Sequence, residues 1–381
     1  MMENYKYLFS IIIPTKNRYS TLFPVLDFLI DNLNDGYNYE VIIQDNSENN
    51  SICLEYLTNR KEPKLKYFYN QASIPISENA ELAIQNSNGK YLIFIGDDDF
   101  ISTQICEIVE YLNNKNIDCL IHNPGYYWWD SVSFSKENFY HKPNNLWLPN
   151  EINFELIALN SDDELNKTLY KGAVSYYLLP RLYHGIIKRD IINKIKSETG
   201  NYIIGSCPDI ALAISISLVL KNYYYVNYPV TIFGASRNSG GGMTARNQHF
   251  GELGKMSFLR PNITNVWDKN IPKVWSQTTI YPQTTTEVLK IFKNSGGPNF
   301  LAFYATMIVN EPYLFNFTFK SILRFCKLNP IKYFYLILLI IKKSIGKLFR
   351  NYKIRFKKLD YKVYEKVEVF DLIKLYPRFN E

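Results

Sequence analysis

Apolar runs alternate with amphipathic stretches along the N-terminal part of the chain. FSIIIPT, YEVIIQDNS, LKYFYN and KYLIFIG are short runs of large apolar residues bounded by polar ones, a pattern typical of buried strands. Between them, STLFPVLDFLIDNL places Leu22, Leu26, Leu29 and Leu33 on one helical face, and SENAELAIQNSNG predicts a second helix. Apolar strands that alternate with helices predict an α/β fold with a mainly parallel sheet flanked by helices.

Polar residues directly follow three of the predicted strands. These segments are Pro14–Arg18, Asp45–Ser47 and Asp97–Asp99. In open α/β sheets, ligands bind beyond the carboxyl ends of the strands. We therefore expect the three segments to converge on one crevice.

Three consecutive carboxylates, Asp97, Asp98 and Asp99, end the fourth predicted strand. They can be solvated turn residues, because Asp favours turns. They can also hold a divalent cation, because one or two carboxylates and the phosphates of a substrate suit Mg²⁺ or Mn²⁺. Such a cation would neutralise the charge that develops on a leaving phosphate. Dinucleotide binding is excluded, because PTKNRYSTLF contains no glycine, and a Walker-type phosphate loop is absent.

The chain beyond residue 120 is harder to interpret. Residues 121–170 are rich in Trp, Tyr, Asn and Pro and show little periodicity. RLYHGIIKRDIINKI predicts a strand that runs into a helix, CPDIALAISISLVL predicts a strongly apolar helix, and VTIFGASRNSGGGMTARNQ predicts a strand followed by a glycine-rich loop. Trp128, Trp129 and Trp147 either belong to the core or stack on sugar faces.

Cysteine and histidine give no sign of a disulfide framework or a zinc site. The five cysteines are odd in number and form no CxxC pair, and the four histidines are scattered. The short apolar run that ends at Pro14 lacks the basic start of a signal peptide. We expect a reduced, cytosolic setting.

The net charge of +7 comes from one C-terminal segment. Lys320–Lys358 contains 12 Lys or Arg and no Asp or Glu, which leaves 31 basic against 36 acidic residues elsewhere. This acidic body argues against a nucleic-acid partner, and no RNA-binding motif accompanies the basic segment.

The basic segment contains an amphipathic helix that is too short to span a membrane. Its uncharged run, Tyr333–Ile341, has nine residues, whereas a span needs about 20. Lys332, Lys343, Lys347 and Arg350 fall within an arc of about 60° opposite a wide apolar face. This pattern is typical of a helix that lies in the membrane interface, with anionic headgroups as its partner. The alternative is a helix packed on the catalytic domain with solvated lysines.

FSIIIPTKNR, VIIQDNSEN and SENAELAIQNSNGKYLIFIGDDD, in this order and spacing, resemble the nucleotide-sugar half of family 2 glycosyltransferases, which have the GT-A fold. The resemblance spans about residues 8–105 and, more loosely, 180–240. It implies a Mn²⁺ or Mg²⁺ ion on two of Asp97, Asp98 and Asp99. Many members have Asp-x-Asp-Asp here, but Gly96 takes the first place, so the register leaves the metal-binding pair open. The residues that it implies for donor binding are Pro14, Thr15, Asn17, Arg18, Asp45, Asn79, Asp97 and Asp98.

The same resemblance implies a catalytic base and an acceptor region. Inversion requires a base that takes the proton of the attacking hydroxyl, and Asp209, just ahead of an apolar helix, has the matching placement. Its alternative role is a carboxylate favoured by the helix dipole. His184 is expected near an acceptor hydroxyl or the diphosphate, unless it is only a hydrogen-bonded structural residue. Arg237 and Arg246 are expected in a loop over the diphosphate, unless that loop is an ordinary mobile one.

These features predict an inverting glycosyltransferase of surface-polysaccharide synthesis at the cytoplasmic face of the membrane. Its donor would be a nucleotide-diphosphate sugar, UDP-linked in the first instance, and its acceptor a glycan or lipid-linked hydroxyl. The alternative is a non-catalytic nucleotide-sugar or glycan binding module on the same fold. We expect a catalytic domain over residues 1–255, with halves of about 1–105 and 106–255. A connecting region over 256–309 and a basic amphipathic segment over 310–381 would follow.

Overall fold

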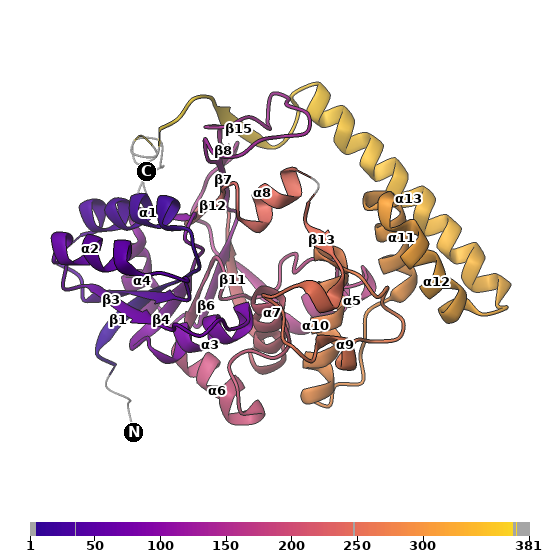
Figure 1. Cartoon of the computed structure of the whole chain (residues 1–381), viewed down its shortest axis with the longest axis horizontal. Helices are drawn as coiled ribbons and strands as arrows, with labels where there is room; N and C mark the ends of the chain where they lie inside the picture. Colours follow the sequence, from indigo (N-terminus) through magenta and orange to yellow (C-terminus); the bar gives the residue numbers. More distant parts are fainter. Residues whose placement is uncertain (1–4, 35, 247, 369–370, 372–381) are drawn as a thin grey trace.

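An eight-stranded sheet forms the centre of the protein (Figure 1). The computed structural model describes residues 5–34, 36–246, 248–368 and 371. The strand order is β3-β2-β1-β4-β10-β6-β11-β9. In that order the strands are β3 (Leu65–Tyr69), β2 (Tyr39–Asp45), β1 (Tyr7–Thr15), β4 (Gly89–Phe94), β10 (Gly185–Lys188), β6 (Cys119–His122), β11 (Asn222–Val226) and β9 (Ile157–Asn160).

The prediction of a mainly parallel sheet is confirmed. Strand β1 runs parallel to β2 and β4, β2 runs parallel to β3, and β6 runs parallel to β11. The antiparallel strands are β10, between β4 and β6, and β9 at the edge. Thr15 is level with Asp45 in the pairing of β1 with β2, so the polar segments after these strands emerge at the same edge.

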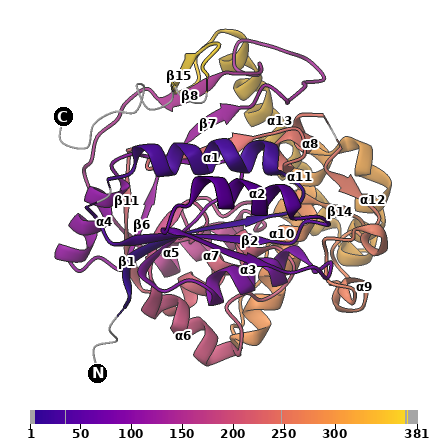
Figure 2. The same ribbon diagram turned by 60° about the vertical axis from the view of Figure 1, so that its left-hand side comes forward.

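Helices cover both faces of the large sheet (Figure 2). Alternate residues of β1 point to opposite faces: Phe9, Ile11 and Ile13 join one buried cluster, and Ile12 joins the other. The first cluster includes α1 (Tyr19–Asn32), α2 (Ser51–Arg60) and α4 (Ile105–Asn114). The second includes α3 (Ile76–Gln85), α5 (Ser161–Tyr170), α6 (Arg189–Thr199) and α7 (Pro208–Val219).

A second sheet has five strands, and two of them, β7 and β8, come from the segment that shows little periodicity. Its order is β15-β8-β7-β12-β5. Strand β5 directly follows the three aspartates and pairs with β12, so the residues after β12 are brought to the acidic loop. The strands are β15 (Tyr361–Tyr364), β8 (Leu146–Pro149), β7 (Gly125–Trp128), β12 (Thr231–Ala235) and β5 (Phe100–Ile101). A two-stranded ribbon joins β13 (Phe250–Gly251) to β14 (Trp275–Ser276).

The C-terminal part is helical, and its longest helix, α13, lies along the outside of the molecule (Figure 1). The elements of this part are α8 (Gly240–Ala245), η1 (Leu253–Lys255), α9 (Ile263–Val266), α10 (Gln277–Ile291), α11 (Phe300–Asn310), η2 (Pro312–Leu314), α12 (Phe315–Cys326) and α13 (Pro330–Arg355). Asn329 caps α13 by accepting from the backbone N–H of Lys332, and Pro330 takes the first helical position. Helix α13 packs against α11. Across the described residues, none of the helices combines the length and apolarity that a membrane crossing requires.

The segment after α13 returns to the second sheet. Strand β15 pairs antiparallel with β8, with Val363 opposite Trp147. The predicted C-terminal segment is therefore joined to the second sheet through β15. Residues 369–370 and 372–381 of that prediction lie outside the described residues.

Candidate active site

An arginine neutralises much of the charge of the acidic loop. Asp97, Asp98 and Asp99 are all buried. Thr15 Oγ1 donates to Asp97 Oδ2 at 2.6 Å, and Arg18 Nε donates to the same oxygen at 3.1 Å. Arg18 Nη2 lies 2.6 Å from Asp97 Oδ1, and Arg18 Nη1 lies 3.6 Å from Asp98 Oδ1. The β1–α1 loop thus bridges two carboxylates with one guanidinium.

The third carboxylate faces away from this arginine. Asp99 Oδ1 accepts from the backbone N–H of Gly234 at 2.7 Å. Asp99 Oδ2 accepts from the backbone N–H of Gly96 at 2.6 Å and from the Tyr183 hydroxyl at 3.0 Å, and His184 Nε2 lies 2.9 Å from it. Asp99 therefore ties β12 and the start of β10 to the acidic loop, and both of its oxygens are occupied.

Asp98 anchors the loop that follows β12. Its Oδ2 accepts from the backbone N–H of Ser236 at 2.9 Å and from the Ser236 hydroxyl at 2.7 Å. Its backbone carbonyl accepts from the indole N–H of Trp129 at 2.8 Å. Trp129 and Trp147 are both buried, so these two tryptophans have core positions, and Trp129 also holds the acidic loop in place.

The three carboxylates differ in protonation behaviour. Burial raises the pKa of Asp97 to about 7 even though the charge of Arg18 acts to lower it. Burial also raises the pKa of Asp98 against the same arginine. Burial alone would raise the pKa of Asp99, but His184 and the backbone donors of Gly234 and Gly96 hold it below the usual value. The loop therefore still favours additional positive charge at Asp97 and Asp98.

The donor atoms at Asp97 and Asp98 fit a hard divalent cation. Asp97 Oδ1 is buried and accepts no aligned hydrogen bond from the described residues, and it faces Arg18 together with Asp98 Oδ1. Two carboxylate oxygens with phosphates and water suffice for Mg²⁺ or Mn²⁺. Within the described ranges, no group of three or more His, Cys, Asp or Glu side chains is arranged to hold a metal ion.

The loops after β1 and β2 are joined beside the acidic loop. Asn17, which has the left-handed backbone φ of 57°, donates its N–H to Ser47 Oγ at 2.7 Å. Its side-chain oxygen accepts from the backbone N–H of Glu48 at 3.0 Å. Because Thr15 and Arg18 also bind Asp97, the predicted convergence of the three polar segments is confirmed.

Asp45 and Asn79 lie deeper than the surface of this crevice. Asp45 is fully buried, and its Oδ2 accepts from the hydroxyls of Tyr19 at 2.6 Å and Tyr67 at 2.8 Å. Asn79 is buried on α3, and its amide points to the carbonyl of Thr15 at 3.5 Å and that of Gln44 at 3.3 Å. Asn79 thus connects the ends of β1 and β2. Pro14, the residue before the last residue of β1, is half-buried.

His184 lies behind the acidic loop. It is completely buried and adopts a left-handed φ of 54°. Its Nδ1 is 2.5 Å from Thr231 Oγ1, which in turn is 3.1 Å from His122 Nε2. This placement supports the structural role for His184 and lends no support to a direct contact with the acceptor or the diphosphate. The sequence analysis missed Thr231, Tyr183 and His122, which no local motif marks.

Asp209 stands in the first turn of α7, directly after Pro208. Its side chain is half-buried, and no side chain in the described part of the chain hydrogen-bonds to it. Burial and the negative charge of Asp99 raise its pKa to about 7. An unpartnered carboxylate with this pKa can exchange a proton near neutral pH.

Residues 10–171 match the family model described as glycosyl transferase family 2. These residues form a family 2 glycosyltransferase domain. The match includes the loops after β1 and β2 and the acidic loop, whereas Asp209 lies C-terminal to it. The sequence has no significant match among curated proteins.

The transferase domain has structural relatives at low identity. The crystal structure of S. aureus TarS 1–349 in complex with UDP-GlcNAc is 15% identical, with 62% of this chain and 60% of that chain covered and a TM-score of 0.43. The crystal structure of TarS 1–349 alone is 13% identical, with 90% of this chain and 91% of that chain covered and a TM-score of 0.43. The chain thus spans about 60% of the length of TarS 1–349 in the first of these matches.

The two loop arginines, Arg237 and Arg246, follow Ser236 and lie C-terminal to the matched residues. Arg237 is exposed, and its backbone carbonyl accepts from Arg246 Nη2 at 2.7 Å. Ser239 caps the short helix α8 between them by accepting from the backbone N–H of Gly242. The glycine-rich loop is therefore partly helical, and the hydrogen bond from the Ser236 N–H to Asp98 fixes its first residues. A contact of Arg237 or Arg246 with a diphosphate stays a prediction.

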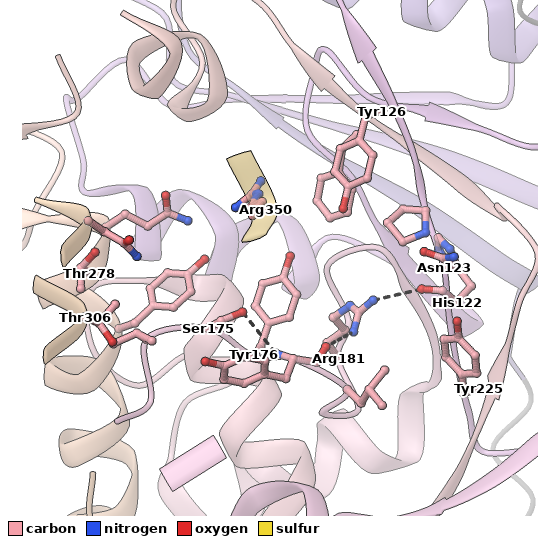
Figure 3. A pocket seen from close by; sticks show the side chains of 18 of the residues that line it. His122, Asn123, Tyr126, Ser175, Tyr176, Arg181, Tyr225, Thr278, Thr306 and Arg350 are labelled. Atoms are coloured by element: carbon pink, nitrogen blue, oxygen red, sulfur yellow. Dashed lines mark hydrogen bonds between the residues drawn. The ribbon is translucent and has the colours of Figure 1, made fainter. Parts of the chain in front are cut away.

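A cavity of about 640 Å³ adjoins this site (Figure 3). Phe233, which lines it, packs on His184 with ring centroids 3.5 Å apart. Tyr176 and Tyr281 also line it, and the charge of Asp209 adds to the effect of burial in raising their pKa values. The cavity therefore lies within electrostatic reach of Asp209. No local pattern in the sequence marks this cavity, because its lining comes from seven separate segments of the chain.

Proposed function

We propose that the protein is an inverting glycosyltransferase of surface-polysaccharide synthesis. It would move a sugar from a UDP-sugar, or a related nucleotide-diphosphate donor, to a hydroxyl of a glycan or lipid-linked acceptor. One observation carries the proposal. Asp209 accepts no side-chain hydrogen bond from the described residues, and it is close enough to Asp99 of the acidic loop and to Tyr176 and Tyr281 of the adjoining cavity for its charge to act on their pKa values or theirs on its own. The complexes of TarS with UDP-GlcNAc and UDP support the choice of donor.

Asp209 is the proposed base. In the transfer step the acceptor oxygen bonds to the anomeric carbon of the sugar while the bond from that carbon to the diphosphate breaks. The hydroxyl proton passes to Asp209, and the negative charge leaves on the nucleoside diphosphate. The pKa of about 7 supports this role, because a base is most effective when its pKa is close to the working pH.

The donor is proposed to lie in the crevice formed by the loops after β1, β2 and β4. Pro14, Thr15, Asn17, Arg18 and Asp45 form or support its wall, and Asn79 supports it from behind. Arg18 is placed to contact the diphosphate, because it already sits over Asp97 and Asp98.

Asp97 and Asp98 are the proposed ligands of a Mn²⁺ or Mg²⁺ ion. When bound, the ion supplies neutralising charge to the leaving diphosphate. Asp99 is assigned a positioning role instead, because four donors from β10, β12 and its own loop already surround its oxygens.

Helices α12 and α13 are proposed to rest on the anionic cytoplasmic face of a membrane. Both helices expose many large apolar side chains, and Lys320–Lys358 contains no acidic residue. Apolar burial and attraction of cations to anionic headgroups act together in such contacts. The exposed apolar residues are Phe315, Phe317, Phe319, Leu323, Leu328, Ile331, Phe334, Tyr335, Ile337, Leu338, Ile341, Ile345, Leu348, Phe349 and Tyr352.

Donor hydrolysis by the purified chain tests the proposed reaction. UDP-, GDP-, CMP- and dTDP-sugars are incubated with Mn²⁺, and release of the nucleoside diphosphate, or of CMP, is measured. Release from UDP-sugars that Asp209→Asn strongly reduces in the presence of an acceptor is the expected result. Tight donor binding without turnover under any condition would favour the non-catalytic binding module instead.

A further inference from the structure

Helix α13 turns a largely apolar face to solvent and its cationic stripe toward the domain, which is the reverse of an ordinary surface helix. Such a helix buries its apolar face and leaves its charges in water. Here Ile345 is 62% exposed and Leu348 is 68% exposed, while Leu336, on the side of the predicted cationic stripe, is 4% exposed. The stripe therefore faces the domain.

The residues of the stripe contact the domain in two ways. Lys332 Nζ donates to the carbonyl of Phe325 at 3.3 Å, and Lys347 Nζ donates to the carbonyl of Val309 at 2.6 Å. Lys343 and Arg350 instead line the cavity that Tyr176 and Tyr281 also line. In Figure 3, Arg350 lies above Tyr176, and Arg181 is drawn among the same lining side chains.

The third cation of this cavity, Arg181, is buried without a carboxylate. It is 4% exposed. Its hydrogen bonds within the described chain go to the carbonyls of Tyr177 at 3.2 Å, Leu179 at 3.5 Å and His122 at 3.3 Å, and its Nε has no partner there. A buried charge is normally paired, because its desolvation is costly.

The cavity as a whole has an excess of positive charge. Arg181, Lys343 and Arg350 line it, none of its described lining residues is Asp or Glu, and no ion pair to any of the three occurs among the described residues. Burial and the charges of Lys171 and Lys342 lower the pKa of Lys343. Burial is the larger of these causes and like charge the smaller, and a bound anion would act in the opposite direction to both.

We propose that this cavity holds the acceptor and that Arg181, Lys343 and Arg350 bind a phosphate group that the acceptor carries close to its reacting hydroxyl. The proposal rests on the proposed function for the identity of the occupant as an acceptor. The volume of about 640 Å³ is within the range of sites for molecules of this size. The neutral polar lining, with Gln277, Thr278, Thr306 and Asn310, can bind sugar hydroxyls.

The phosphate can come from two kinds of acceptor. It can belong to a diphosphate that links a glycan to a lipid, or to a phosphodiester within a water-soluble chain. Both present the same group to the three cations, so the chemistry of the site is common to both. Transfer assays with the two acceptor forms separate them.

Phosphate binding without turnover is the first test. Inorganic phosphate is titrated into the full chain by ³¹P NMR in the presence of saturating UDP and diamagnetic Mg²⁺, which are added to fill the proposed donor crevice. The double variant Lys343→Ala/Arg350→Ala should raise the phosphate Kd about tenfold or more, because charge-assisted hydrogen bonds are lost. Lys342→Ala, one residue away on α13 and not among the lining residues, is the matched control and should change Kd less than about twofold. Thermal melting of each variant checks its fold, and Lys343→Gln/Arg350→Gln repeats the test if the alanine variant melts early.

Acceptor discrimination is the second test. The KM of a phosphate-bearing acceptor, lipid-linked or water-soluble, should rise in the double variant far more than the KM of a neutral glycoside. A phosphate Kd that is unchanged in both double variants would overturn the anion site. Equal effects on charged and neutral acceptors would overturn its role in acceptor binding. If no donor is turned over at all, the proposed function fails, but the ³¹P titration still decides whether the anion site exists.

Discussion

Replacement of Asp209 by asparagine separates its catalytic role from a structural one. Asparagine keeps the size and polarity of the side chain but cannot accept the hydroxyl proton. The substitution breaks no side-chain hydrogen bond of the described residues, because none reaches this carboxylate. The fold and the donor crevice should therefore be retained.

The expected loss follows from the position of Asp209. A positioned base contributes about 10²- to 10⁴-fold, so kcat should fall by this factor, which corresponds to about 3 to 5 kcal/mol in the barrier. The Kd of UDP should change less than about twofold, because the base acts on the acceptor. The ratio of these two effects is the informative quantity.

The assay combines steady-state transfer with a direct binding measurement. Transfer to an acceptor is followed by release of UDP, and UDP affinity is measured by calorimetry at the same pH and metal concentration. Glu198→Gln, on the neighbouring helix α6 and exposed, is the control for removal of a carboxylate away from the site. A loss of UDP affinity as large as the loss of kcat would refute the base and make Asp209 a structural residue of the α7 start.

Three further predictions concern charge in the site. The kcat/KM of the wild type should rise through an acid limb near pH 7 and then level off, because burial and Asp99 raise the pKa of Asp209 to about 7 and only its ionised form takes the proton; the pH profile of transfer shows this limb, and Asp209→Asn should lack it. Asp209→Asn should also melt at or above the temperature of the wild type at pH 8: burial raises the pKa of Asp209 in the folded protein from its usual acidic value to about 7, so ionisation of this carboxylate lowers the stability increasingly as the pH rises toward 7. EDTA should abolish transfer and Mn²⁺ restore it, and Asp98→Asn should weaken UDP binding only when metal is present; full activity in EDTA would contradict the metal site.

Much of the donor side of the site could be predicted from the sequence because it is local. Each polar segment directly follows a buried strand, and parallel pairing brings such segments to one edge of the sheet, as the level pairing of Thr15 with Asp45 shows. Arg18 was expected near the donor, but its bridge across Asp97 and Asp98 was not. The spacing of residues in a loop does not reveal which side chain folds back onto a carboxylate.

The second sheet and the cavity could not be predicted in the same way, because their residues come from distant parts of the chain. Strands β7 and β8 have four residues each and β5 has two, which is too short for alternation to be recognised. Three partners of Asp99, namely Tyr183, His184 and Gly234, lie 84 to 135 residues further along the chain. Such pairs depend on topology, and a single sequence contains no signal for them.

The amphipathic pattern of α13 shows why orientation needs the structure. Periodicity identifies residues that share a face, but it leaves open which face meets the domain. The observed choice leaves large side chains such as Ile341, Ile345 and Leu348 in contact with solvent. Burial of one such side chain is worth about 1.5 to 3 kcal/mol, so an aqueous environment alone would favour the opposite rotation.

A membrane on the outer face of α13 would cover these apolar side chains and remove the cost of exposing them to water. The same rotation of α13 brings Lys343 and Arg350 to the cavity. The two faces can therefore be tested separately. Ile341→Ser/Leu348→Ser should release the full chain from anionic vesicles in a sedimentation assay at moderate salt, because headgroup attraction is screened over about 8 Å at physiological ionic strength and apolar burial carries the rest. The same variant should keep the phosphate Kd of the wild type. If it sediments with the vesicles as fully as the wild type does across a salt series, the outer face of α13 is not the membrane contact, and its apolar side chains are then left for a partner protein.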